Sequence, residues 1–75
     1  MKTPRWRDLI VSTPGTLGGR PRFQGTRIPV SLILGYLADG ASVEEVLAEF
    51  DGLRDEHVRA ALDFARSLTE YDAVA

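Results

Sequence analysis

The sequence predicts a mostly α-helical domain, a three-helix bundle with a helix-turn-helix pattern, preceded by a short two-stranded β element. Apolar residues recur at helical spacing in three segments after Pro29. The two connections between those segments are short, and each contains a glycine. Before Pro29, brief apolar runs alternate with turns rich in glycine and proline, which is typical of short strands.

The β element is expected within the first third of the chain. Asp8-Leu9-Ile10-Val11 is an apolar run closed by Ser12-Thr13-Pro14-Gly15, and Arg22-Phe23-Gln24 alternates polar with apolar residues after a second turn. We therefore predict that residues 9–11 pair with residues 22–24. Such a ribbon is only weakly stable in isolation.

The first helix is predicted to begin at Pro29, because the first turn of a helix tolerates a residue without an N–H group. It should end near Gly40. Leu32 and Tyr36, four residues apart, lie off the main apolar stripe, so this helix is apolar on two sides. The main stripe consists of Val30, Ile33, Leu34 and Leu37.

The second helix begins with a capping box, in which Ser42 accepts a bond from the Glu45 amide while the Glu45 carboxylate reaches back. It should end at Asp51-Gly52. Its apolar face consists of Val43, Val46, Leu47 and Phe50.

The third helix is predicted from about residue 55 to residue 69, with Asp55 and Glu56 at its positive N-terminal end. Its apolar stripe consists of Val58, Ala61, Leu62, Ala65 and Leu68.

Three amphipathic helices with such short connections must cover one another's apolar faces, so we expect a single domain over residues 1–75. A basic N-terminal arm and the β element would occupy residues 1–28, and the bundle residues 29–72. Residues 43–50 and 55–69, joined around Gly52, match the spacing of a helix-turn-helix. Helical hairpins that bind no DNA share this spacing.

Composition disfavours several classes of function. The chain has no cysteine and a single histidine, His57, so neither a disulfide framework nor a zinc site is expected. No arrangement of nucleophile, base and orienting group is present, so we expect a non-enzyme with no catalytic residue, metal or cofactor. The apolar runs are far shorter than the roughly 20 residues of a membrane span, and no signal-peptide pattern follows the first basic residues. A soluble cytoplasmic protein without membrane association is the expectation.

The charge is strongly polarised along the chain. Residues 1–31 carry six basic residues and one acidic residue, a net charge of +5, whereas the remainder carries three arginines and ten acids, a net charge of −7. Clustered Lys and Arg raise the local potential and favour phosphate. The same polarity also fits two halves of the protein that pack against each other.

Residues 14–65 closely resemble the bacterial domain-of-unknown-function 433 family. The resemblance rests on Gly19-Arg20-Pro21, a short strand, Gly25-Thr26-Arg27-Ile28-Pro29-Val30 and, in the third helix, Ala60-Ala61-Leu62. It implies a homeodomain-like or winged-helix-like fold of three helices. It also implies an antitoxin encoded beside a nuclease-like toxin of the PIN superfamily, with autoregulatory DNA binding.

The sequence departs from the family pattern at the start of the third helix. Where the family usually has a capping Ser or Thr, this chain has Arg54, whose side chain cannot accept a bond from the free amides. Either the helix start frays or Asp55 acts as the cap. Asp55, Glu56 and Asp63 also make this helix a poor surface for phosphate, because each acid repels the DNA backbone.

Seven residues are predicted to contact DNA, since arginine binds phosphate bidentately and a basic arm beside an aromatic residue can lie in a groove. Plainer alternatives are a structural bond of an arginine to nearby carbonyls or acids, a disordered, solvated tail formed by Lys2, Arg5 and Arg7 around Trp6, and a histidine at the rim of the core. The seven are Arg5, Arg7, Arg20, Arg22, Arg27, Arg54 and His57.

A second apolar face on the first helix favours contact with a partner protein or a second copy. The alternative is a broad core contact with Phe23 or Trp6. The residues predicted to contact a partner are Trp6, Leu32, Tyr36, Phe64 and Tyr71.

These predictions combine into an antitoxin of a type II toxin–antitoxin pair. It would bind and neutralise a PIN-like ribonuclease toxin and, as a homodimer, bind operator DNA to repress transcription of its own operon. The alternative is an interaction module that dimerises or docks on a protein without touching DNA.

Overall fold

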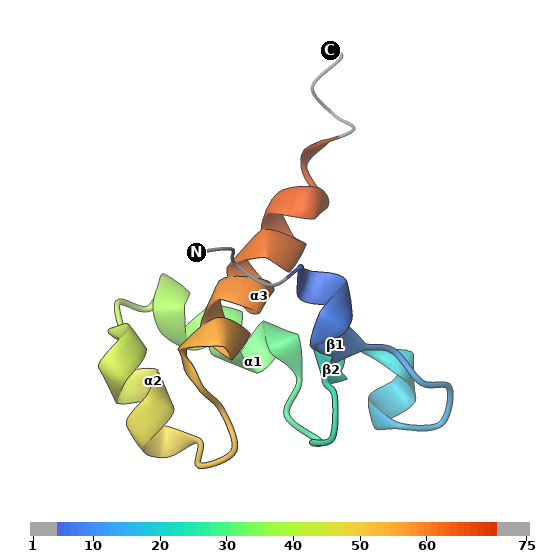
Figure 1. The fold of residues 1–75 in the computed structure, drawn as a ribbon, viewed down its shortest axis with the longest axis horizontal. Helices are drawn as coiled ribbons and strands as arrows, with labels where there is room; N and C mark the ends of the chain where they lie inside the picture. The colour runs from blue at the N-terminus through green and yellow to red at the C-terminus, as the bar shows by residue number, and fades with distance from the viewer. Residues whose placement is uncertain (1–4, 71–75) are drawn as a thin grey trace.

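The computed structural model describes residues 5–70 and confirms the predicted class, three helices with a two-stranded antiparallel sheet (Figure 1). Single 3-10 turns, η1 and η2, flank the first strand. In chain order the elements are η1 (Trp6–Asp8), β1 (Ile10–Val11), η2 (Leu17–Gly19), β2 (Arg22–Phe23), α1 (Val30–Ala38), α2 (Val43–Glu49) and α3 (Asp55–Ser67).

The sheet forms where the sequence predicts it. Ile10 lies opposite Phe23 and Val11 opposite Arg22, and the amide of Gln24 donates to the carbonyl of Leu9 at 2.8 Å. Because side chains alternate along a strand, Ile10 and Phe23 share the face that is buried against the helices. That burial stabilises a ribbon too short to persist alone.

The loop between β2 and α1 is held by its own hydrogen bonds. Gly25 has φ +81°, a left-handed conformation that suits glycine. The Thr26 hydroxyl donates to the carbonyl of Phe23 at 2.8 Å and accepts from the amide of Ile28 at 3.0 Å. Pro29 is the N-cap of α1, one residue before the predicted position within the first turn. These bonds fix the direction in which α1 leaves the sheet.

All three helices contribute to one core. Its fully buried members come from the sheet, from α1, from α2 and the turn after it, and from α3: Ile10, Phe23, Val30, Ile33, Val46, Leu53, Val58, Ala60 and Ala61. α1 contacts both α2 and α3. The described residues include no helix long and apolar enough to cross a bilayer.

The predicted apolar stripe of α3 is wrong at two positions. Leu62 is 50% exposed, because it lies round the helix from Ala61 on the side away from the core. Leu68 is 53% exposed although it continues the line of Ala61 and Phe64. The C-terminal end of α3 projects beyond the other elements, so no core remains there for Leu68 to enter (Figure 1).

The helix-turn-helix segment is capped differently at its two starts. The predicted capping box of α2 is present, with the Ser42 amide 2.8 Å from Glu45 Oε1 and the Glu45 amide 3.1 Å from Ser42 Oγ. At α3 the N-cap is Arg54, without a side-chain cap. The suggestion that Asp55 caps this helix is wrong, since Asp55 is its first residue. The cap comes instead from His57, whose Nδ1 accepts from the Arg54 amide at 2.9 Å.

The described part of the expected N-terminal arm is not a solvated tail. η1 packs on α3, and the Trp6 ring meets the Phe64 ring edge-to-face with 4.8 Å between centroids. The Trp6 amide also lies 3.4 Å from Asp63 Oδ2. These contacts join the basic N-terminal half to the last helix.

Candidate interaction surface

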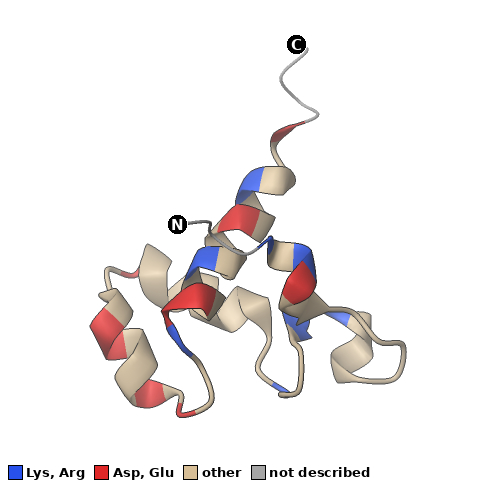
Figure 2. Ribbon diagram, in the orientation of Figure 1, with Lys and Arg blue, Asp and Glu red and all other residues tan. Residues whose placement is uncertain are grey.

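The helix-turn-helix face carries mostly negative charge. Residues 42–59 include six acids and two arginines. Figure 2 shows acidic segments along α2 and at the start of α3, with others in η1, in the middle of α3 and just beyond its end, whereas the basic segments are scattered from η1 to the loop before α1 and along α3. An acidic face repels a phosphate backbone, which disfavours the usual docking of this motif on DNA.

Arg22 has a structural role. Its Nη1 donates to the Thr26 carbonyl at 3.0 Å and its Nη2 to Thr13 Oγ1 at 3.0 Å, while its buried Nε has no partner in the described structure. The side chain therefore links the turn after β1 to the loop before α1. These contacts make Arg22 the least available of the arginines predicted to bind DNA.

Other predicted DNA contacts remain exposed. Arg20, Arg27 and Arg54 are exposed, and among residues 5–70 they form no ion pair with an acid. Arg5 is also exposed, and the Arg7 guanidinium lies 4.6 Å from the centre of the Trp6 ring.

His57 is occupied within the fold. Besides capping α3, its half-buried ring meets the Phe23 ring edge-to-face at 5.6 Å. Its location matches the rim-of-core alternative, and base contact by His57 stays a prediction.

The ion pairs of the described residues all lie on α3 or just beyond it. Arg59 pairs with Asp55, and Arg66 pairs with Asp63 and Glu70. The hydrogen bond from Arg66 holds the pKa of Asp63 below its usual value, and the two carboxylates raise the pKa of Arg66. The positive charge of Arg66 is therefore neutralised locally.

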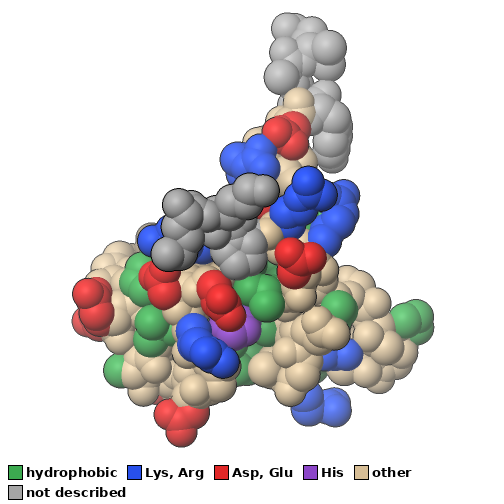
Figure 3. All heavy atoms as spheres, viewed as in Figure 1, with side chains coloured by type: hydrophobic (Ala, Val, Ile, Leu, Met, Phe, Trp, Pro, Cys, Tyr) green, Lys and Arg blue, Asp and Glu red, His purple; other side chains and the backbone are tan. Residues whose placement is uncertain are grey.

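The second apolar face of α1 is exposed, as its position off the main stripe indicated. Leu32 is 43% exposed and Tyr36 is 38% exposed. The proposed core contact with Phe23 or Trp6 is wrong, because the Tyr36 ring instead meets Phe50 at 5.5 Å. Figure 3 shows hydrophobic side chains reaching the surface between acidic ones on the side of the molecule that α2 occupies.

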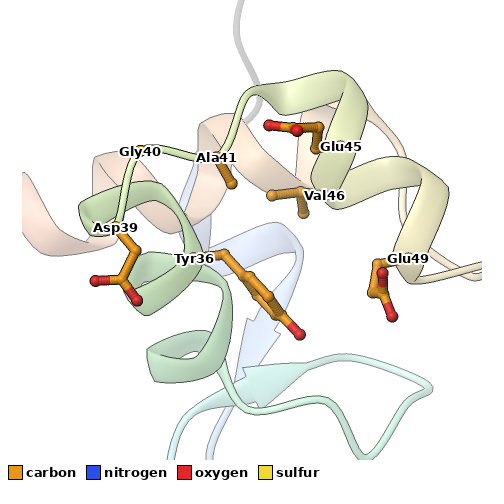
Figure 4. Close-up of a pocket in the computed structure, with 7 residues that line it drawn as sticks. All are labelled: Tyr36, Asp39, Gly40, Ala41, Glu45, Val46 and Glu49. Atoms are coloured by element: carbon orange, nitrogen blue, oxygen red, sulfur yellow. The ribbon is translucent and has the colours of Figure 1, made fainter.

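This face continues into a groove between α1 and α2. One hollow of about 380 Å³ is lined by Tyr36, Asp39, Gly40, Ala41, Glu45, Val46 and Glu49. A second hollow of about 220 Å³ is lined by Ser31, Leu32, Gly35, Tyr36 and Asp39. Because both share Tyr36 and Asp39, we call them together the α1–α2 groove. In Figure 4 the Tyr36 side chain extends from α1 across the space below α2, with the carboxylates of Asp39, Glu45 and Glu49 at different sides of it.

Trp6 and Phe64 are each half-buried and largely cover one another, so α1 presents the more accessible part of the predicted partner interface. Tyr71 lies outside the described residues.

Sequence reasoning missed Asp39, Ala41 and Glu49 as members of a groove. Asp39 and Ala41 flank Gly40, whose φ of +101° turns the chain between the helices, but no local pattern shows that this turn leaves a hollow.

Among residues 5–70 no group of three or more His, Cys, Asp or Glu side chains could hold a metal ion. Besides hollows beside Phe64 and Leu68, the described surface offers exposed arginines, an acidic helix-turn-helix face and the α1–α2 groove with its acidic residues.

Comparison with known proteins places the chain among relatives of undescribed activity. Residues 10–65 match the family model described as "Protein of unknown function (DUF433)". The uncharacterized protein y4eO of Sinorhizobium fredii (strain NBRC 101917 / NGR234) is 38% identical over 61 residues, which cover 81% of this chain and 28% of that protein. The chain therefore spans less than a third of this curated relative.

A solved structure shows the same fold. The crystal structure of a DUF433 member protein from Anabaena variabilis ATCC 29413 is 37% identical in sequence and superposes with a TM-score of 0.78, covering 87% of this chain and 64% of that one. The family match spans the strands, all of α1 and α2 and most of α3, and includes the Gly-Thr-Arg-Ile-Pro-Val string of residues 25–30. This chain therefore belongs to the DUF433 family, as its motifs indicated.

Proposed function

We propose that this protein is the antitoxin of a type II toxin–antitoxin pair in the bacterial cytoplasm, and that it neutralises a PIN-like ribonuclease by binding rather than by catalysis. The observation that carries the proposal is the exposed apolar face of α1, formed by Leu32 and Tyr36 and continued by the groove. The family resemblance supplies the class of the partner.

The energetics favour a protein partner at this face. A fully buried Leu or Tyr side chain contributes roughly 1.5–3 kcal/mol relative to exposure, and both side chains retain a large exposed fraction. Tyrosine is also enriched among residues that dominate binding energy at interfaces. Packing against Phe50 holds the Tyr36 ring in place before binding, which reduces the entropy lost on association.

Co-expression with the product of the neighbouring gene, which the proposal expects to be a PIN-like nuclease, tests the proposal. We expect the two proteins to purify as a stable complex and the growth inhibition caused by the nuclease to be relieved. A nuclease that inhibits growth equally with and without this protein, and that does not co-purify with it, would contradict the antitoxin function.

A second function, binding of operator DNA by a homodimer, is favoured by the exposed arginines that lack ion pairs within residues 5–70. Arg20 and Arg27 lie in the part of the chain that carries the excess positive charge, outside the acidic helix-turn-helix face. Without DNA binding, the protein would be the plain interaction module that the sequence left as the alternative.

Substitution of Arg20 and Arg27 by alanine tests DNA binding. The affinity for the upstream region should fall with salt, and the double variant should reduce the slope of log K against log salt by about 4 for the homodimer, since each protomer loses two phosphate contacts and each contact contributes roughly 1. Arg59→Ala is the matched control, because Arg59 is paired with Asp55 on the acidic face. Arg22→Ala is unsuitable, because it would break two structural hydrogen bonds. Binding that ignores salt, or equal losses in the control, would rule out this role.

A further inference from the structure

The α1–α2 groove combines apolar walls with unpaired negative charge. Val46 is fully buried at its floor, and the Tyr36 ring forms one wall. Among the described residues no Lys, Arg or His forms an ion pair with Asp39, Glu45 or Glu49. One oxygen of Glu45 accepts from the Ser42 amide, and no hydrogen bond of the described structure uses its other oxygen.

This combination sets the chemistry of an occupant. A purely aliphatic side chain would partly remove water from the three carboxylates without giving them a new partner, which costs free energy. An anionic ligand would be repelled. A long cationic side chain satisfies both features, since its methylene stem lies along apolar surface while its head group meets the carboxylates. Arginine fits better than lysine, because its planar guanidinium bonds carboxylates bidentately and stacks on an aromatic ring.

The adjoining hollow beside Leu32 adds a second requirement. It is lined by Ser31, Leu32, Gly35, Tyr36 and Asp39, and the exposed Leu32 side chain there can pack against an aliphatic side chain. Leu32 lies on α1 and Asp39 is the C-cap residue of the same helix, and Tyr36 and Asp39 line both hollows. The two hollows therefore adjoin at the C-terminal half of α1.

We propose that the groove binds a segment of the partner protein that carries an aliphatic residue and an arginine close together. The aliphatic side chain lies against Leu32, and the guanidinium enters the hollow that Tyr36, Asp39 and Glu49 line. This inference rests on the proposed protein-binding function and names the chemistry of the partner at the same site.

A peptide titration tests the groove without the toxin. The probe is the capped hexapeptide Ala-Leu-Ala-Ala-Arg-Ala, followed at low salt by the amide shifts of the isotope-labelled protein. Saturable shifts are expected at Gly35, Tyr36, Gly40 and Ala41. The peptide with glutamine in place of arginine should bind several-fold more weakly and the lysine peptide should lie between. The absence of shifts at these amides, or equal binding of the arginine and glutamine peptides, would overturn the proposal.

Paired variants test whether the acids act at the groove. Asp39→Asn with Glu49→Gln should weaken both the peptide and the toxin complex about 2- to 30-fold, since two partly exposed charge pairs are removed. Glu44→Gln with Asp51→Asn removes the same charge outside the groove and should leave both affinities unchanged. Equal effects of the two pairs would overturn the proposal.

The two proposals fail in different ways. If the toxin does not bind the wild-type protein, the antitoxin function is wrong, and the peptide titration alone then tests whether the groove binds an arginine-containing segment. If the toxin binds the wild type and the Asp39 and Glu49 variant equally well, the inference about the groove fails while the function stands.

Discussion

Replacement of Phe23 by alanine is expected to leave the domain largely unfolded at room temperature. The Phe23 side chain is 0% exposed, lies opposite Ile10 in the sheet and meets the His57 ring edge-to-face. Truncation of a buried phenylalanine to alanine costs about 3–5 kcal/mol. A single core in a domain of this size rarely supplies more than about 3–5 kcal/mol, so the loss matches the whole stability.

Urea titration followed by circular dichroism measures this effect. Phe23→Leu keeps most of the volume, so it should unfold at a lower urea concentration but still cooperatively, with a cost of about 1.5 kcal/mol or less. Gln24→Ala is the neighbouring control. The Gln24 side chain is exposed and the substitution keeps the backbone hydrogen bond from residue 24 to Leu9, so the free energy of unfolding should change by no more than about 0.5 kcal/mol. A cooperative transition of Phe23→Ala at the wild-type midpoint would show that the sheet does not belong to the core.

Replacement of Leu32 by aspartate should abolish binding of the partner while leaving the fold intact. Leu32 is 43% exposed, so the free protein tolerates a carboxylate there. In the complex the new carboxylate would be buried against the apolar side chain of the partner, which is costly. Burial of an unpaired polar group costs at least about 2 kcal/mol, which corresponds to a roughly 30-fold or greater loss of affinity.

One leucine and one isoleucine, Leu62 and Ile33, provide the controls. Leu62→Asp makes the same change at a leucine of α3 that is 50% exposed and outside the groove, and it should preserve both folding and binding. Ile33→Asp, one residue along α1, places the charge in the core at a side chain that is 0% exposed and should unfold the protein. The complex is measured by calorimetry or by co-purification. Retained affinity in Leu32→Asp, or an equal loss in Leu62→Asp, would exclude the α1 face as the interface.

The helices were predictable because their signals are local. The capping box of Ser42 and Glu45 and the apolar spacing of Val30 and Ile33 need only neighbouring residues, and both are present as predicted. The predicted burial of Leu62 and Leu68 on α3 was wrong. Periodicity identifies the apolar side of a helix, but it does not show how far along the helix the other elements cover that side. The cap of α3 by His57 was not predicted, because the usual signal is an oxygen-bearing side chain at the N-cap, whereas here the acceptor is a ring nitrogen three residues after Arg54.

The predicted site residues were likewise predictable in their chemistry but not in their availability for binding. Their chemistry could be read from the sequence, since an arginine is a potential phosphate ligand wherever it lies. Availability depends on contacts across the fold: Arg22 is engaged by Thr13 and Thr26, whereas Arg20 and Arg27 are exposed. The groove was not predictable from local patterns. Asp39 lies at the end of α1 and Glu45 and Glu49 lie on α2, and the packing of the two helices determines that they line one hollow.

The family, the three helices, the β ribbon and the separation of basic from acidic residues follow from the amino-acid sequence alone. These depend on short-range hydrogen bonding, on apolar spacing and on motif identity, all of which are properties of neighbouring residues. The packed fold was needed to show which side of α1 remains exposed, which arginines are engaged, and that acidic residues line the α1–α2 groove. Those features depend on which surfaces the packed core covers, and burial is a property of the whole fold rather than of any one segment.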